Sequence, residues 1–136
     1  MRKLSTADLK WLEERFANYC NFEKEINQRR FELNYRPENQ TPETQRHPSQ
    51  ESQVEKFIIK VMTDDYISDR ERWKNGIETV YKKASDDLKE IIELKFIECP
   101  YLSWEEVGDR LHYSTAKVYR RRYVILERLA KEINYI

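Results

Sequence analysis

Glycine and proline are scarce in this chain, which has 2 glycines and 4 prolines among its 136 residues. Folds rich in β-turns, such as sandwiches and barrels, normally draw on both residue types for their many turns. Abundant Glu, Lys, Arg and Leu favour helices instead. Three of the four prolines fall between residues 36 and 53, so most interruptions are expected there. The sequence therefore predicts an all-α protein.

The composition is polar for a folded protein, with 37% charged and 39% hydrophobic residues. A core must then be built from apolar stripes on amphipathic helices. The 3 Trp, 9 Tyr and 5 Phe residues supply aromatic rings for such stripes and argue against disorder. No stretch approaches about 18 consecutive apolar residues, and no apolar region of the signal-peptide type follows Met1. We therefore expect no membrane partner and a cytoplasmic location.

The N-terminal half of the chain divides into two segments. Residues 1–35 carry an apolar stripe at helical spacing and predict an N-terminal helix or helical hairpin, capped at Ser5 or Thr6 and broken near Asn18–Asn21. Residues 36–53 contain no apolar residue apart from three prolines, and predict a polar linker.

The rest of the chain predicts four further helices. Residues 54–84 show a second apolar pattern and are interpreted as one long central helix, interrupted at most near Ser68. Residues 85–136 predict a three-helix domain, with helices over about 88–96, from Ser103 and from Ser114. Ser103 and Glu106 have the spacing of a capping box, in which each side chain accepts the other residue's amide.

The last two helices and their short link have the layout of a helix-turn-helix. Gly108 lies in the first of them, where we expect a close approach of the following helix to account for it. Formal net charge is zero, but residues 112–124 carry four basic side chains and no acidic one. Such local positive charge suits a helix that enters the major groove of DNA.

The second of these helices supplies most of the predicted DNA-binding residues. Arg and Lys can donate to guanine edges, small methyl groups can contact thymine, and serine at a helix start can bind phosphate. Arg120, Arg121 and Arg122 point in different directions around a helix, so at least one must face phosphate. The predicted DNA-binding residues are Ser103, Ser114, Thr115, Ala116, Lys117, Tyr119, Arg120, Arg121, Arg122 and Tyr123.

Residues 101–111 and 113–120 resemble region 4 of sigma-70-type factors, which reads the promoter −35 element. The wider layout resembles the RinA/ArpU family of phage and prophage late-gene transcriptional activators, through Leu4-Ser5, the polar linker, the long helix and Thr115-Ala116. The resemblance implies activation of late structural or packaging genes by binding promoter DNA in the nucleoid of a bacterial host, with host RNA polymerase as a further partner. The sequence departs from the sigma pattern in two ways: Arg121 replaces an apolar residue, and Thr115-Ala116 replace a charged pair.

Other functions receive less support from the sequence. The two histidines, His47 and His112, have no nucleophile or carboxylate at motif spacing, so we expect no enzyme and no cofactor. Cys20 and Cys99 lack a CxxC partner and predict two buried or half-buried free thiols rather than a disulfide or metal site. The alternative is an adaptor or protein-interaction module that binds RNA polymerase without contacting DNA. Self-association through the N-terminal or central helices stays open, as does packing of residues 1–35 within one chain or between chains.

Overall fold

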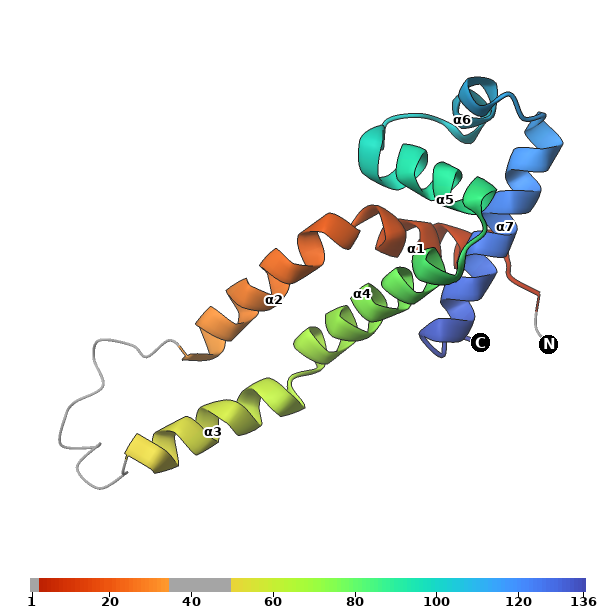
Figure 1. Ribbon diagram of the computed structural model, residues 1–136. Coiled ribbons are helices and arrows are strands. Elements are labelled where there is room, and N and C mark those ends of the chain that lie inside the picture. Colours follow the sequence, from red (N-terminus) through yellow and green to blue (C-terminus); the bar gives the residue numbers. More distant parts are fainter. Residues whose placement is uncertain (1–2, 35–49) are drawn as a thin grey trace. The chain divides into compact units, whose positions relative to one another are not determined.

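The computed structural model of the chain describes residues 3–34 and 50–136, and every regular element in these ranges is a helix (Figure 1). The prediction of an all-α fold is confirmed. The chain divides into two compact units, Met1–Cys20 with Arg72–Ile136, and Asn21–Glu71. In the described residues, no helix combines the length and apolar character required to cross a membrane.

The N-terminal segment forms two helices, α1 (Thr6–Ala17) and α2 (Tyr19–Asn34). Ser5 caps α1 in a capping box. The Ser5 hydroxyl accepts the Asp8 backbone amide, and the Asp8 carboxylate accepts the Ser5 backbone amide. The helices separate at Asn18, whose amide donates to the carbonyls of Glu14 and Arg15 at 3.1 and 3.2 Å. The predicted cap and the predicted break near Asn18 are both confirmed.

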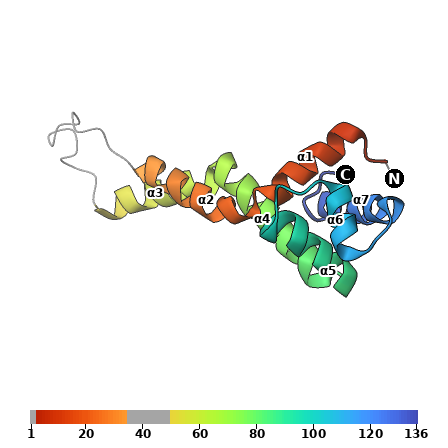
Figure 2. The ribbon, with the colours of Figure 1, turned by 90° about the horizontal axis from the view of Figure 1, so that it is seen from above.

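The first unit is built around α7 (Thr115–Glu132), the helix at the C-terminal end of the chain. Helices α1 and α6 (Trp104–Leu111) pack on α7 (Figure 2). Helix α5 (Asp86–Ile92) continues into the π-helix η2 (Glu93–Glu98), which packs against α1 and α6. The largest fully buried side chains of this unit are Leu12, Phe16, Ile91, Val107, Val118, Ile125, Leu126 and Leu129. Apolar stripes from separate helices therefore meet in one core.

Helix α1 packs against α7 of the same chain. The Tyr135 hydroxyl donates to the Asp8 carboxylate at 2.6 Å, and the Tyr135 ring stacks on Trp11 with centroids 4.9 Å apart. Just before α1 begins, the Leu4 amide donates to the Tyr123 hydroxyl at 3.1 Å. The predicted boundary at residue 85 implied that the C-terminal helices form a unit by themselves. In the structure they do not. They share their core with α1 and with the chain from Arg72 onward.

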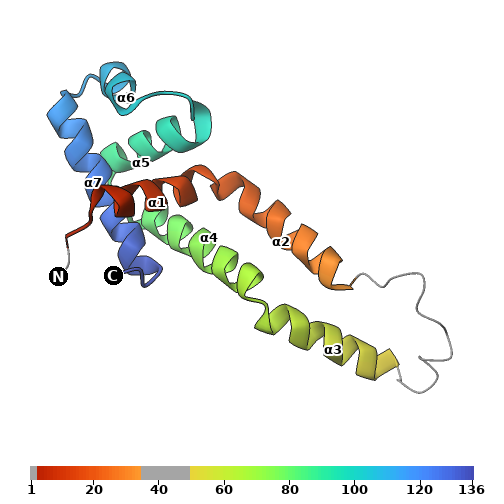
Figure 3. The ribbon, with the colours of Figure 1, turned by 180° about the vertical axis from the view of Figure 1, so that it is seen from behind.

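The second unit contains α2 from Asn21, α3 (Gln50–Thr63) and the beginning of α4 (Asp65–Lys83), with α2 running beside the other two (Figure 3). Two sequence predictions need correction here. Residues 50–53, assigned to the linker, are helical, while most of the linker lies outside the described residues. The single long helix predicted over 54–84 is two helices separated at Asp64.

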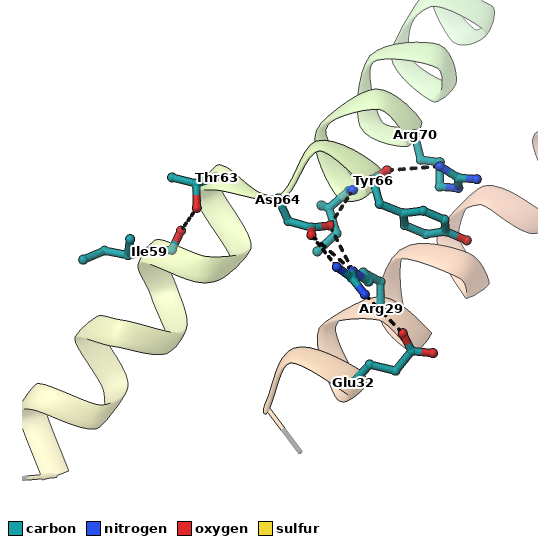
Figure 4. Close-up of polar contacts among 8 residues, drawn as sticks. Arg29, Glu32, Ile59, Thr63, Asp64, Tyr66 and Arg70 are labelled. Carbon is teal, nitrogen blue, oxygen red and sulfur yellow. Dashed lines mark hydrogen bonds and ion pairs between the residues drawn. The ribbon is translucent and has the colours of Figure 1, made fainter. Parts of the chain in front are cut away.

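The break at Asp64 has a visible cause (Figure 4). Its carboxylate accepts the amide of Ile67, three residues on, which is the hydrogen bond of an N-cap. The same carboxylate accepts hydrogen bonds from Nη2 and Nε of Arg29 in α2, at 2.9 and 3.2 Å respectively. These bonds to Arg29 lower the pKa of Asp64, since they favour the charged carboxylate. A local cap and a contact distant in sequence therefore act together on the residue where α4 begins.

We expect Asp64→Ala to join α3 and α4 into one continuous helix, because alanine removes the cap and is the best helix former. Spin labels at Glu55 and Ser68, in a background without the native cysteines, would then separate toward the roughly 20 Å that 13 residues span in a straight helix. Double electron–electron resonance measures this distance.

The neighbouring exposed residue provides the matched control for this experiment. Asp65→Ala removes a carboxylate from the same turn but leaves the cap in place, so the label distance should not change. An unchanged distance in Asp64→Ala would show that Asp64 does not cause the break.

Candidate nucleic-acid interface

Helix α6 begins with the predicted capping box. The Ser103 hydroxyl accepts the Glu106 amide at 3.2 Å, and the Glu106 carboxylate accepts the Ser103 amide at 3.3 Å. Trp104 and Val107 are buried, so the box sets where α6 starts and which face it presents to the core.

A three-residue turn, residues 112–114, joins α6 to α7. The Tyr113 amide donates to the Gly108 carbonyl at 2.8 Å and the His112 amide to the Asp109 carbonyl at 3.4 Å. This pair of bonds is a Schellman motif, which ends a helix through one left-handed residue. That residue is His112, with φ 61° and ψ 38°, where glycine is more usual.

Gly108 lies where the two helices come closest. A Cβ atom at this position would be 3.0 Å from Val118 Cγ2 and 3.1 Å from the Tyr113 carbonyl oxygen. Both distances are shorter than ordinary van der Waals contact. The predicted approach of the following helix to Gly108 is therefore confirmed.

The first turns of α7 present several of the predicted residues to solvent. Ser114 is the N-cap, and its hydroxyl accepts the Lys117 amide at 3.2 Å. Lys117 is half-buried, with its ammonium group 4.1 Å from the centre of the Tyr113 ring. The exposed predicted residues are Ser103, Ser114, Thr115, Ala116, Tyr119 and Arg120. Within residues 3–34 and 50–136, Arg120 makes no ion pair.

Tyr119 is the exposed aromatic residue of this surface. Its hydroxyl donates to a carboxylate oxygen of Glu105 at 2.7 Å, which joins α7 to the first turn of α6. The hydrogen bond raises the pKa of Tyr119 and lowers that of Glu105, because it favours the phenol and the carboxylate.

The next two arginines turn back toward the protein. Arg121 pairs with Asp87 of α5 at 3.2 Å, with 38% of its side chain exposed. Arg122 is more enclosed, at 18%, and donates to Glu13 of α1 at 3.2 Å. Arg121 stands where the sigma pattern has an apolar residue. Its charge is accommodated by the ion pair with Asp87 on the flank of α7.

Glu13 joins three helices, and nothing in the sequence pointed to it. One carboxylate oxygen accepts the Arg122 guanidinium and the other accepts the Trp104 indole N–H. The carboxylate therefore connects α1 with α6 and α7. Tyr123 also faces inward, since its hydroxyl accepts the Leu4 amide. Three predicted DNA-binding residues, at positions 121, 122 and 123, are thus occupied in holding the unit together.

A hollow of about 730 Å³ lies elsewhere on the first unit, between α1, α4 and η2. Its lining includes the apolar residues Phe16, Ile77, Ile92, Phe96 and Ile97. Three glutamates and one lysine also line it: Glu78, Glu93, Glu98 and Lys82. The charge of this hollow is opposite in sign to that of the start of α7.

Nothing in the described part of the chain forms a metal centre, because no group of three or more suitable ligands occurs there. Cys20 and Cys99 are free thiols as predicted, and Cys99 is half-buried as expected. The expectation of burial is wrong for Cys20, which is exposed.

The fold and this site define an all-α protein with two capped helices joined by a tight turn and a basic, exposed start to the second. Residues 10–131 match the family described as "Protein of unknown function (DUF722)", and the chain belongs to that family. No curated protein and no solved structure gave a match. The resemblance to sigma region 4 and to RinA/ArpU activators therefore stays a prediction from the residues.

Proposed function

We propose that this protein is a sequence-specific DNA-binding regulator of transcription that places the start of α7 in the major groove. The observation that carries this proposal is the exposed position of Arg120, with Thr115 and Ala116 beside it, at the beginning of a capped helix. A recognition helix contacts base edges with its N-terminal residues, and these three side chains suit guanine and thymine edges.

Phosphate contacts would come from the margins of the same surface. Ser114 and the first amides of α7 form a helix N-terminus, which favours anions. Lys117 lies in the same first turn, and Ser103 caps α6 in an exposed position. Tyr119 can contribute a contact to the sugar–phosphate backbone. Arg121, Arg122 and Tyr123 keep α7 in place and reach DNA only if their internal contacts are released.

The biological role in this proposal comes from the resemblance of the wider sequence layout to the RinA/ArpU family, together with the sigma-region-4-like pattern of residues 101–120. It is activation of phage or prophage late genes, with promoter DNA as the ligand and host RNA polymerase recruited through a second surface. The basic start of α7 and the acid-lined hollow would then serve different partners.

We expect Arg120→Ala to weaken binding to a promoter fragment about 10- to 100-fold, as the loss of one bidentate base contact does. The DNA flanking the encoding gene is the natural probe, and fluorescence anisotropy over a series of salt concentrations measures the affinity. Arg128→Ala is the matched control, because Arg128 is an exposed arginine two turns further along α7 and should matter little.

Equal losses in the two variants would mean that only overall charge matters, and would contradict a base contact at Arg120. The second candidate function is an adaptor that binds RNA polymerase alone, which the apolar, acid-lined hollow favours. Absence of DNA binding even at low salt, together with retention of polymerase, would replace the first proposal with the second.

A further inference from the structure

Helix α3 carries large apolar side chains that the described part of the chain leaves in solvent. Val54, Ile58 and Met62 are four residues apart and form one row along the helix, with exposed fractions of 55%, 47% and 76%. Ile59 stands beside this row and is 60% exposed. Single exposed apolar residues are common, but a continuous row indicates a binding surface.

The chain's own linker has the wrong composition to cover this row. Residues 36–53 contain no Val, Ile, Leu, Met, Phe, Tyr or Trp. Apart from three prolines, the segment consists of polar and charged residues, which would lose hydration by lying on aliphatic side chains. The occupant must therefore bring apolar side chains of its own.

We propose that the occupant is a second copy of this chain, with two α3 helices packed antiparallel about a two-fold axis at Ile58. Val54 and Met62 are equidistant from Ile58, so the two-fold axis places Val54 of each copy against Met62 of the other. A row of residues four apart is a ridge, and two such ridges interdigitate in the most common class of helix packing. The surface is thus complementary to itself, as a two-fold interface requires.

Charge does not oppose this pairing. At 100° per residue, Lys56 and Lys60 project about 160° away from Ile58, on the opposite side of α3. Glu55 flanks the row, but the antiparallel arrangement separates the two copies of Glu55 by about 9 Å along the helix axis. Each copy of Glu55 therefore stays at the rim, in contact with water.

The apolar area also agrees with a dimer. The four residues are 47–76% exposed, so each still has on the order of 100 Å² to remove from water, or roughly 400 Å² together. A standard interface buries about 800 Å² per partner, of which about 60% is apolar, or nearly 500 Å². The row can thus supply most of the apolar part, with polar neighbours forming the rim.

The test is sedimentation velocity of the full chain over a wide range of concentrations. The wild-type protein should approach twice the monomer mass of 16.7 kDa. Ile58→Glu should raise the dissociation constant at least about a hundredfold, since it buries two unpaired carboxylates at the centre of the interface. Ile97→Glu is the matched control, because Ile97 is equally an exposed isoleucine, 51% exposed on η2, and should leave the dimer intact.

A charge exchange tests the orientation and guards against simple loss of folding. Because Ile58 faces Ile58 of the partner, Ile58→Lys should also be monomeric alone, while an equal mixture with Ile58→Glu should dimerise again. Far-UV circular dichroism checks that both variants stay helical. A wild-type protein that stays monomeric at every concentration, or an Ile58→Glu variant that stays dimeric, would overturn the proposal. A mixture that stays monomeric would also overturn it. None of these outcomes depends on DNA binding.

Discussion

Glu13→Ala is expected to lower the free energy of unfolding by about 2 kcal/mol, because it leaves the Arg122 guanidinium and the Trp104 indole N–H without their acceptor. Removing one partner of an enclosed ion pair costs more than the pair contributes, since the remaining charge stays partly desolvated. The Glu13 and Arg122 side chains each keep about a fifth of their surface in water, which reduces the cost below that of a fully buried pair.

Urea unfolding followed by circular dichroism measures this effect. Glu14→Ala is the matched control, because Glu14 is exposed and its nearest ion-pair distance is 3.8 Å, to the adjacent Arg15. We expect that change to stay within about 0.5 kcal/mol of wild type. Replacing Glu13 with leucine and Arg122 with methionine together should cost less than the sum of the two single changes, because no charge is then left alone.

Glu13→Ala also connects stability with the proposed function. Glu13 lies outside the surface proposed to bind DNA, but it fixes α6 relative to α7 through Trp104 and Arg122. Glu13→Ala should therefore weaken DNA binding only to the extent that it unfolds or loosens the unit. An unfolding free energy equal to that of the Glu14→Ala control would show that the three-helix contact contributes no stability.

Those parts of the fold that short-range chemistry decides could be predicted from the sequence. The caps at Ser5, Ser103 and Ser114 each depend on atoms within three residues. Spacing alone located the caps at Ser103 and Ser114 and limited the first cap to Ser5 or Thr6. Gly108 was interpretable for a similar reason, since the turn beside it brings the next helix close.

The parts that distant contacts decide could not be predicted. The apolar pattern of residues 54–84 continues past Asp64, and only Arg29, 35 positions earlier, completes the capped break there. Likewise, a run of three arginines looks uniform in sequence. Glu13 and Asp87 then draw two of them inward and leave Arg120 exposed. Local pattern thus located the candidate interface, while long-range partners selected which of its residues face outward.

Gly76 is the position where a distant contact should have its largest effect on stability. It lies within α4, and a Cβ atom there would be only 2.6 Å from Ile133 Cγ2 and 3.3 Å from Leu129 Cδ1. In an exposed helix, glycine to alanine stabilises by about 1 kcal/mol. Here we expect Gly76→Ala to destabilise the protein by about 1–2 kcal/mol and Gly76→Val by about 3 kcal/mol, because overpacking outweighs helix propensity. Urea unfolding and thermal melts measure both.

Two companion variants separate packing from propensity in this prediction. Asn75→Ala makes the same kind of change at the exposed neighbouring position and should be neutral or stabilising, because it meets no second helix. Ile133→Ala removes the methyl group that the new Cβ would strike, so adding it to Gly76→Ala should cost less than the two single losses together. Stabilisation by Gly76→Ala alone would mean that α4 and α7 do not pack closely at this glycine. The α4–α7 contact would then not be part of the core of the first unit. Destabilisation that Ile133→Ala partly relieves would instead identify the α4–α7 crossing as the contact that requires glycine. Because residues 76 and 133 are far apart in the sequence, no local pattern could have indicated this contact.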